Sequence, residues 1–197
     1  MDRTIVRLGQ EHREAAAQTL AEAFFDDPAM GWMMPEPAQR RRSLLKLTRW
    51  MVSEHLANAF VLGTPGCEVV TLWRPPGTMH LKTPLWHPAS LRFLPIFGRH
   101  VWRAALVDEA IHRHLPADDR WLYLRMAGVR PDHQGKGLGG LAIRAGIAEA
   151  DRLGVPVVLE TATESNLALY RNLGFETSRE WTVPRGGPQF WTMTRGE

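Results

Sequence analysis

The residues best suited to chemistry form a glycine-rich loop, Gln134-Gly135-Lys136-Gly137-Leu138-Gly139-Gly140, between an apolar strand pattern and a helical pattern. Glycine lets the main chain approach a ligand closely and adopt positive φ, so successive N–H groups can converge on one anion. The start of the following helix adds unpaired N–H donors and the positive end of its dipole. The loop therefore predicts a cradle for a phosphate or pyrophosphate, with a tight turn that binds nothing as the alternative.

One candidate ligand is a dinucleotide, because Gly135, Gly137 and Gly140 satisfy the pattern G-x-G-x-x-G and Glu160 follows about 20 residues later. Two features argue against it. Residues 130–134 separate the strand from the first glycine, and the chain after the loop offers one helix–strand–helix unit and a terminal hairpin rather than successive βαβ units. A P-loop is excluded because no Gly-Lys is followed by Ser or Thr. A dinucleotide-binding protein stays open as a weaker alternative.

The loop resembles the acyl-CoA motif of the GNAT N-acetyltransferase superfamily, Q/R-x-x-G-x-G/A, with Gln134, Gly137 and Gly139 at the motif positions. A second landmark of that superfamily, N-x-x-x-Y-x-x-x-G-F, is matched from Asn166 to Phe175. The two motifs occur in the family's order and in register with the predicted strands and helices. Together they outline an acyl-CoA-binding core of about residues 121–176 within a single domain spanning residues 1–197.

Within the superfamily, the chain is similar to the puromycin N-acetyltransferase branch at residues 129–139, 154–156, 159–161, 183–184 and 191–195. The likeness fades before Trp121, in the part of the chain that builds the amine-binding surface. Membership of the branch therefore does not identify the acceptor.

The resemblance implies direct transfer of an acetyl group from acetyl-CoA to a primary amine of a small molecule, without a covalent enzyme intermediate. Strand main-chain groups would pair with the pantetheine arm, and loop N–H groups would hold the pyrophosphate. The cofactor-binding residues it implies are Ala127, Val129, Gln134, Gly135, Lys136, Gly137, Leu138, Gly139, Gly140, Asn166 and Tyr170.

Two proton transfers accompany this reaction. The amine is protonated at neutral pH and must lose a proton before it attacks, and a proton donor stabilises the departing thiolate. The family motif points to Tyr170 as the general acid, and a phenol with a pKa near 10 keeps its proton at pH 7. Glu160, at the end of the next predicted strand, is our candidate for the base. The alternatives are that Tyr170 only packs the helix against the sheet and that Glu160 makes a salt bridge or capping contact. Asn166 is expected to cap the short helix.

The acceptor wall is expected where the first helix ends, at a cluster of aromatic and acidic residues. An acidic pair beside aromatic rings would suit a cationic, partly aromatic amine. The candidate substrate-binding residues are Phe25, Asp26, Trp32 and Trp73, from a wider set that includes Phe24, Asp27, Met33 and Trp86. For each of them, an ordinary core or helix-ending role is the alternative.

The order of predicted elements gives an α+β fold with a mixed central β-sheet flanked by helices. Helices are expected at 10–25, 38–58, 101–114, the segment after the loop to 153, and 166–173. Strands are expected at 4–8, 60–62, 68–73, 121–129, 155–161, 175–183 and 189–194. Residues 29–37 are expected to form a loop rich in Met and Trp.

Composition limits the remaining classes of protein. The chain has 197 residues with 44% hydrophobic and 23% charged, which is typical of a globular domain. Its net charge of +3 has one tight basic cluster, Arg40-Arg41-Arg42, which we interpret as a solvated helix face rather than a nucleic-acid site. The charged start of the chain and its single cysteine, Cys67, favour a cytoplasmic protein that does not bind to a membrane.

No metal is expected, because His80, His87, His112 and His114 lack partners at ligand spacing. A homodimer paired through sheet edges or C-terminal strands remains open. The rival from another functional class is a non-catalytic module that binds and senses acyl-CoA.

Overall fold

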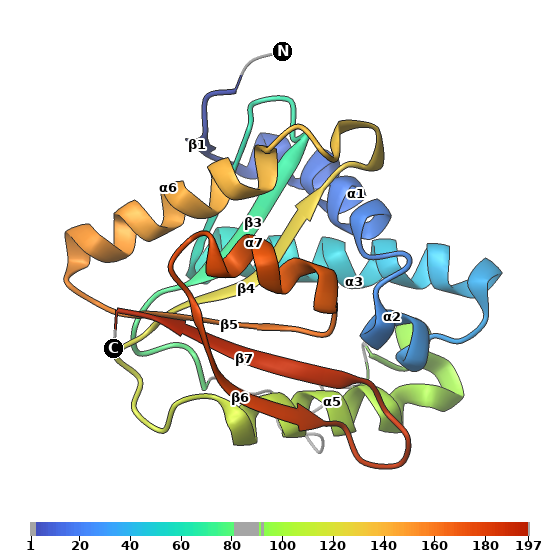
Figure 1. Ribbon diagram of the computed structural model, residues 1–197. Helices are drawn as coiled ribbons and strands as arrows, with labels where there is room; N and C mark the ends of the chain where they lie inside the picture. The colour runs from blue at the N-terminus through green and yellow to red at the C-terminus, as the bar shows by residue number, and fades with distance from the viewer. Residues whose placement is uncertain (1–2, 81–90, 92, 197) are drawn as a thin grey trace.

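A computed structural model describes residues 3–80, 91 and 93–196, and its centre is a seven-stranded sheet with the order β1-β2-β3-β4-β5-β7-β6 (Figure 1). Neighbouring strands are antiparallel except β4 and β5, which run parallel. The strands are β1 (Val6–Arg7), β2 (Phe60–Gly63), β3 (Val69–Arg74), β4 (Leu122–Val129), β5 (Val157–Thr161), β6 (Glu176–Thr182) and β7 (Gln189–Arg195). The mixed sheet and the α+β class confirm the fold prediction.

The helices fall into two layers around this sheet (Figure 1). They are α1 (Arg13–Ala23), α2 (Pro28–Met33), α3 (Pro37–Asn58), α4 (Leu94–Phe97), α5 (Val101–His114), α6 (Leu138–Leu153) and α7 (Leu167–Arg171). Short 3-10 turns precede or join several of them: η1 (Gln10–His12), η3 (Gly98–His100), η4 (Pro131–His133) and η5 (Glu164–Asn166). The predicted helix at 101–114 is confirmed to the residue, while that at 10–25 divides into η1 and α1.

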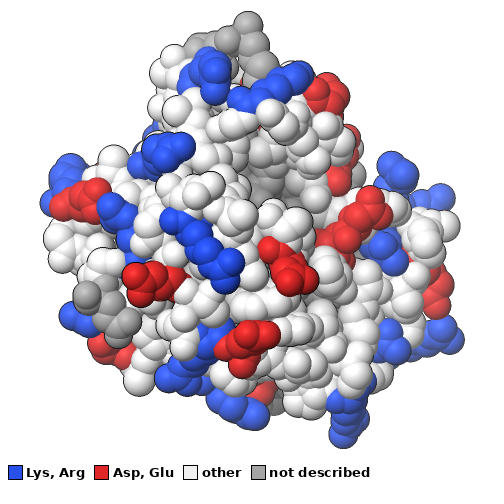
Figure 2. Space-filling model, viewed as in Figure 1, with Lys and Arg blue, Asp and Glu red and all other residues white. Residues whose placement is uncertain are grey.

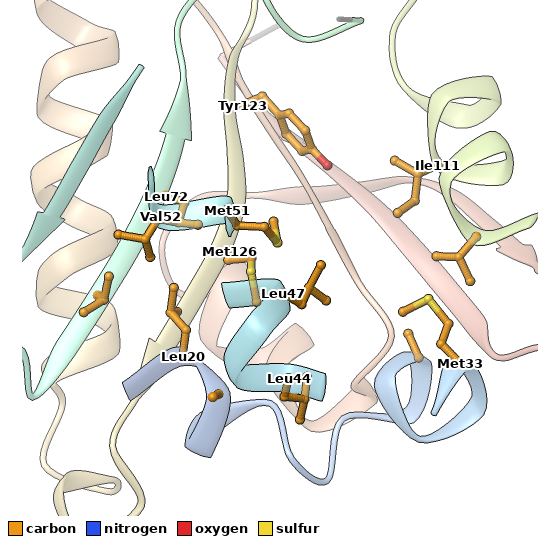
Figure 3. Close-up of a cluster of buried hydrophobic side chains, with 14 of the residues drawn as sticks. Leu20, Met33, Leu44, Leu47, Met51, Val52, Leu72, Ile111, Tyr123 and Met126 are labelled. Atoms are coloured by element: carbon orange, nitrogen blue, oxygen red, sulfur yellow. The ribbon is translucent and has the colours of Figure 1, made fainter. Parts of the chain in front are cut away.

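Side-chain alternation along the strands builds a separate apolar core on each face of the sheet. Leu72, Tyr123 and Val158 pack with α1, α3 and α5 on one face, where Figure 3 shows Tyr123 projecting from β4 toward Ile111. On the other face Trp73 and Leu124 pack with α6 and α7.

Helices α1 and α6 each pack closely on the sheet because a glycine lies at the contact. A Cβ on Gly128 would lie 2.9 Å from Leu20 and Ala23 of α1, and one on Gly146 would lie 2.0 Å from the Trp73 ring. Glycine at these two positions therefore sets how near the helices come to β3 and β4.

The parallel strands β4 and β5 stay paired over only three residues. Their register runs Leu122↔Val157, Tyr123↔Val158 and Leu124↔Leu159, and it stops there. Beyond Leu124, β4 continues to pair with β3, with a β-bulge at Arg125, while β5 continues to pair with β7. The bulge adds one unpaired residue and turns the strand. The sheet therefore splits, and Arg125 and Glu160 are the first residues past the last pair.

One local prediction is wrong: residues 29–33 of the segment expected to be a loop belong to helix α2, which Pro28 begins. The first helix ends at Ala23, earlier than predicted. Proline is tolerated in the first turn of a helix, where its missing N–H is not needed. The Asp27 carboxylate caps this start by accepting hydrogen bonds from the N–H groups of Ala29 (2.9 Å) and Met30 (3.0 Å).

The basic cluster at the start of α3 is only partly a solvated face. Arg40 is half-buried and donates hydrogen bonds to the carbonyl oxygens of Phe25, Met34 and Pro35. This arginine therefore ties the end of α2 to the segment before it. On the face shown in Figure 2, basic and acidic side chains are scattered among each other, without a broad basic patch of the kind that nucleic-acid binding needs. In the described part of the chain, no helix combines the length and the apolar character needed to cross a membrane.

Candidate acetyl-transfer site

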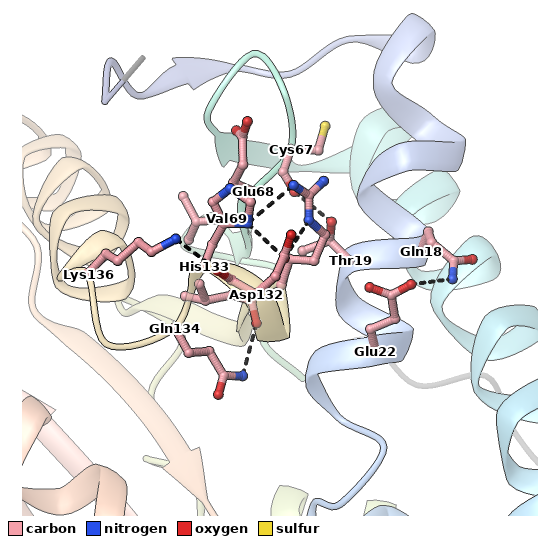
Figure 4. A network of polar contacts seen from close by, with 12 residues as sticks. Gln18, Thr19, Glu22, Cys67, Glu68, Val69, Asp132, His133, Gln134 and Lys136 are labelled. Atoms are coloured by element: carbon pink, nitrogen blue, oxygen red, sulfur yellow. Dashed lines mark hydrogen bonds and ion pairs between the residues drawn. The ribbon is translucent and has the colours of Figure 1, made fainter. Parts of the chain in front are cut away.

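The glycine loop is fixed by side chains that hydrogen-bond its own flanks (Figure 4). Gln134 Nε2 donates to the Val129 carbonyl oxygen (3.1 Å), and Lys136 Nζ donates to the Asp132 carbonyl oxygen (2.8 Å). Gly135 has φ +73° and Gly137 has φ +78°, a region that other residues enter only with strain. The predicted glycine positions are therefore required by the backbone, and the Lys136 ammonium is used within the loop.

Six consecutive main-chain N–H groups, from Gly135 to Gly140, have no hydrogen-bond acceptor within the described residues. Those of Leu138, Gly139 and Gly140 belong to the first turn of α6, where N–H groups have no intrahelical partner. A Cβ on Gly135 would meet nothing within 4 Å, so the loop is open on that side. Arg3 donates to the Lys136 carbonyl oxygen (3.2 Å), which adds a positive charge nearby. This arrangement suits a phosphate-bearing ligand.

The split between β4 and β5 leads from this loop to the sheet's centre. Residues 126–129 of β4 pair with β3 but not with β5, so this edge of β4 is open for main-chain pairing with an extended ligand. Ala127 and Val129 both lie on the open segment. The Val129 carbonyl oxygen already accepts a hydrogen bond from Gln134, which leaves Ala127 as the freer of the two.

A cavity of about 390 Å³ lies at the other end of the split, between the sheet and helices α2, α3 and α5. Apolar and aromatic side chains form much of its wall, among them Phe24, Met30, Met33, Trp50, Phe93, Phe97 and Phe190. Several charged groups and both tyrosines of the chain also reach it: Asp27, Glu54, Arg74, Asp108, Arg125, Glu160, Tyr123 and Tyr170. A concave apolar site with a few convergent polar groups is the usual form of a small-molecule pocket.

Glu160 has the carboxyl group best suited to accept a proton here. Its Oε1 is buried and has no hydrogen-bond partner among the described residues. Burial raises the pKa of Glu160 to about 7, against the opposing influence of a hydrogen bond from Tyr123 and the charge of Arg125. A base whose pKa lies near the working pH combines an available lone pair with useful basicity.

Tyr170 lies on α7 and faces the same cavity from the side of the split. Burial, and then the nearby Asp27 carboxylate, raises the pKa of Tyr170 to about 12. Its hydroxyl therefore keeps its proton at neutral pH. Burial also raises the pKa of Asp27, against hydrogen bonds from Met30, Ala29 and Thr163.

The comparisons with known proteins agree with this geometry. A family model described as acetyltransferase (GNAT) domain matches residues 98–177, a range that contains β4, the glycine loop, β5 and α7. Residues 98–177 of this chain thus match a GNAT acetyltransferase domain, and the chain has the GNAT fold.

The chain is 26% identical over 185 residues to an uncharacterized N-acetyltransferase of Schizosaccharomyces pombe, and the match covers 84% of this chain and 71% of that protein. Its fold is similar to that of a structure of histone acetyltransferase HPA2 and related acetyltransferase from Corynebacterium glutamicum, with TM-score 0.73, 23% identity, and 98% and 94% of the two chains covered. A polyamine N-acetyltransferase from Drosophila melanogaster, which forms N-acetylagmatine, matches with TM-score 0.60 and 15% identity over 97% and 98% of the chains. At these identities the structural likeness shows the fold alone.

The GNAT fold brings most of the predicted cosubstrate residues together along the split. Tyr170, Glu160 and Ala127 line the cavity, and so does Asn166. Asn166 occupies the N-cap position of α7 without a capping hydrogen bond from its side chain, so the expected capping contact is absent. Leu138 is buried in a cluster with Val69 and Ala142, which leaves only its main chain to meet a ligand.

The four predicted acceptor residues do not line the cavity. Trp73 is fully buried on the opposite face of the sheet, where its ring stacks on Phe60 and its Nε1 donates to Thr71 Oγ1 (2.8 Å). Trp32 packs edge-on against Trp102 at 5.9 Å, under the Arg103 guanidinium.

The other two predicted residues, Phe25 and Asp26, are also absent from the cavity lining. Phe25 lies beneath the guanidinium groups of Arg40 and Arg41, and Asp26 is exposed. Their neighbours Phe24 and Asp27, from the wider predicted set, line the cavity instead, as does Met33. A shift of one residue on a helix or turn changes the direction of the side chain by about 100°. Trp86 lies outside the described residues.

Sequence reasoning did not single out the polar and charged residues on the side of the cavity away from the glycine loop. These are Glu54 and His55 from α3, Arg74 from β3, Asp108 from α5, and Tyr123 and Arg125 from β4. One signal was available for the last two. Tyr123 and Arg125 are polar groups at alternate positions of an otherwise apolar strand, and so they point to the same face. For the others, the residues are far apart in the chain and no spacing rule connects them.

Within the described residues, no group of three or more His, Cys, Asp or Glu side chains is arranged to hold a metal ion. His80 bonds the Pro116 carbonyl oxygen, and His114 stacks on Trp181 at 4.4 Å. His87 of the predicted histidine set lies outside the described residues. The dinucleotide alternative needs successive parallel strands, whereas β4 and β5 form the sole parallel pair among the strands described.

Proposed function

We propose that this protein is an acetyl-CoA-dependent N-acetyltransferase that acetylates a primary amine of a small molecule by direct attack. The observation that carries the proposal is the split between β4 and β5, which joins the glycine loop to the cavity and has Glu160 at its closed end. The loop would bind the pyrophosphate, and the open edge of β4 at Ala127 would pair with the pantetheine arm. Such positioning makes the attack effectively unimolecular and lowers the barrier by several kcal/mol.

In the proposed reaction, Glu160 accepts a proton from the ammonium group, and the free amine then attacks the thioester carbonyl. The new C–N bond forms as the C–S bond breaks, and Tyr170 donates its proton to the departing thiolate. The second proton on the new amide nitrogen returns to the Tyr170 phenolate, and Glu160 releases its proton to solvent, so the products are the acetamide, free CoA thiol and one proton. The pKa of Glu160 near 7 supports its role as the base, and the raised pKa of Tyr170 keeps its hydroxyl protonated at neutral pH.

The acceptor side supports an amine in a general sense. Two acidic side chains at the cavity, Asp27 and Glu160, favour a cationic group near the split. The Drosophila neighbour with the same fold acetylates agmatine, which is also a small amine. The likeness of residues 129–139 and 154–161 to the puromycin N-acetyltransferase branch stays a prediction, and puromycin is therefore one of the amines to test.

The first test is calorimetric titration of the full chain with acetyl-CoA and, separately, with NADH. Micromolar binding of acetyl-CoA without an NADH signal is expected. Free-thiol release with a panel of amines then distinguishes an enzyme from a module that only senses acyl-CoA, because a sensor binds acetyl-CoA and turns over no amine. Binding of NADH alone would overturn the proposal and make Glu160 a candidate ribose ligand.

A further inference from the structure

Arg125 places a charged group inside the cavity that the transfer chemistry does not use. It lies at the β-bulge of β4, directly past the last residue paired with β5. Its Nη1 donates a hydrogen bond to the Tyr123 hydroxyl (2.9 Å), and its side chain lines the cavity. Tyr123 uses only one N–H group of this guanidinium. The remaining nitrogens are not fully buried, so their N–H groups face the cavity that the side chain lines.

A second guanidinium lies close to the first. Arg74, at the end of β3, also lines the cavity, and its pKa is lowered by burial and then by the positive charge of Arg125. Its ion pair is a long one, with Nη2 3.6 Å from Glu54 Oε2. This side of the cavity therefore presents two neighbouring cations: Arg74, which pairs with Glu54, and Arg125, for which no ion pair is found among the described residues.

Two carboxylates lie near this pair. Glu54 is the ion-pair partner of Arg74, because His55 beside it is neutral, with its pKa lowered to about 3 by burial, and bonds the Met51 carbonyl oxygen through Nδ1 (2.7 Å). Asp108 lies 3.5 Å from His112 Nδ1. Among the described residues, no carboxylate oxygen lies within 4.0 Å of the Arg125 guanidinium. A sheltered guanidinium with free N–H groups is well matched to a carboxylate, which it can bind with two parallel hydrogen bonds.

The Tyr123 hydroxyl connects this arginine to the proposed base. It accepts a hydrogen bond from Arg125 and lies near enough to Glu160 to lower the pKa of that carboxyl. Arg125 and Glu160 both follow directly on the last β4–β5 pair, Leu124–Leu159, and both line the cavity. The groups suited to a carboxylate and to an ammonium therefore come from adjacent strands, as an α-amino acid requires.

We propose that the acceptor is an amine with a carboxylate next to its amino group, an α-amino acid with an apolar side chain, whose carboxylate binds Arg125 and Arg74 while its amino group lies at Glu160. This inference rests on the proposed function and specifies its substrate class. The apolar side chain would occupy the wall formed by Met30, Met33 and the Trp50–Phe93 pair, whose rings meet edge-on at 5.1 Å.

The experiment compares matched acceptors with the full chain and saturating acetyl-CoA, by release of free thiol. L-Phenylalanine, L-phenylalaninamide and phenethylamine differ only in the carboxylate, and L-methionine, L-methioninamide and 3-(methylthio)propylamine form a second set. We expect kcat/KM for each amino acid to exceed that of its amide and amine by about 10- to 100-fold, the size of a charge-assisted contact at a sheltered site. Agmatine and puromycin complete the panel as amines without a carboxylate.

Arg125→Gln should remove this preference, so that kcat/KM for the amino acids falls to that of the amides and amines. The comparison is made at pH 9, because loss of the Arg125 charge also raises the pKa of Glu160 and slows every acceptor at neutral pH. Arg125→Lys keeps the charge without the planar fork and should keep part of the preference. The matched control is Arg113→Gln, an exposed arginine on α5 outside the cavity, which should behave as the unaltered protein. Should Arg125→Gln fail to fold, the acceptor comparison on the unaltered protein decides the matter by itself.

Equal or faster acetylation of the amides, of the amines or of agmatine would overturn the inference while leaving the proposed function intact. Failure to bind acetyl-CoA would instead overturn the proposed function. If acetyl-CoA binds but no acceptor turns over, calorimetry of the CoA-bound protein with L-phenylalanine replaces the kinetic test. Binding that Arg125→Gln abolishes would support the inference, and absence of binding would overturn it.

Discussion

The two sides of the cavity are built in different ways. On the side facing the glycine loop, the groups proposed to bind the cosubstrate come from one short segment, residues 127–140. Most of these groups are main-chain atoms. The opposite side takes side chains from α2, α3, β3, β4 and α5, which lie far apart in the chain. A binding site made of main-chain groups leaves a local sequence signature, because glycine is required where the backbone turns. A site made of distant side chains leaves none.

Each side also holds one of the chain's two tyrosines, in a different setting. Tyr170 comes from the motif-bearing helix α7, and the charge that acts on it is that of Asp27. Tyr123 comes from β4 and joins Arg125 to Glu160. We therefore expect the side that carries the glycine loop and α7 to govern the transfer step. The opposite side is expected to govern the choice of acceptor and the pKa of Glu160. Substitutions on each side can separate these roles.

The largest effect is expected at Glu160, where both sides meet. Glu160→Gln should lower kcat/KM on the order of 10³-fold at pH 8 by removing the base. In the unaltered protein kcat/KM should rise with pH through about 7, since only the carboxylate accepts a proton, and the variant should lack that step. The matched control, Glu164→Gln in the exposed turn before α7, should leave both the rate and its pH profile unchanged.

Glu160→Gln should also change how the free energy of unfolding depends on pH, and the change would have the opposite sign if Glu160 formed a structural salt bridge. Because folding raises the pKa of Glu160 from 4.5 to about 7, the folded protein binds its proton more tightly, and stability falls as pH rises across that window. Glu160→Gln should therefore gain up to about 3 kcal/mol relative to the unaltered protein between pH 4.5 and 8, measured by urea unfolding. A loss of relative stability over this range would identify Glu160 as an ion-paired group and remove it as the base.

The next largest effect is expected at Tyr170. Tyr170→Phe keeps the ring and its edge-on contact with Phe175 at 6.0 Å but removes the proton donor. Turnover should fall on the order of 10²-fold while the affinity for acetyl-CoA, measured by calorimetry, stays nearly constant. Unaltered turnover would mean that Tyr170 only packs α7 against the sheet.

A smaller effect, confined to the side that carries the glycine loop, is expected at the loop itself. Gly137→Ala puts a Cβ on a backbone with φ +78° and should weaken acetyl-CoA binding by about tenfold in calorimetry. Gly154→Ala is the matched control, since Gly154 has φ +68° at the other end of α6 with nothing within 4 Å of its Cβ. Similar affinities for the two variants would mean that the loop does not form the cradle.

The smallest effect is expected at Tyr123. Its hydrogen bond lowers the pKa of Glu160, so Tyr123→Phe should raise that pKa and move the activity profile toward higher pH. The loss at pH 7 should stay below about tenfold, with most of it recovered by pH 9, in contrast to the pH-independent loss in Tyr170→Phe. An unmoved profile would show that Tyr123 does not act on the base.

The predictions from sequence succeeded where local geometry demands particular residues. Gly135 and Gly137 have positive φ, Tyr170 and Glu160 reach one cavity, and the helix at 101–114 has the expected bounds. They failed where direction matters more than position. Phe25 and Asp26 lie one residue away from Phe24 and Asp27, whose side chains line the cavity. Residues 29–33, expected to be a loop, belong to helix α2.

The amino-acid sequence by itself determined the order of strands and helices, the glycine cradle and the two candidate proton-transfer groups, because backbone conformation and side-chain periodicity are local properties. Only the tertiary structure decided which aromatic residues are core and which are pocket: Trp73 lies on the face covered by α6, whereas Tyr123 lies on the face covered by α3 and α5. It also decided the environment of Glu160 and Arg125. Burial and the charge of neighbours depend on which distant elements pack together, and the split between β4 and β5 brings those elements to one point.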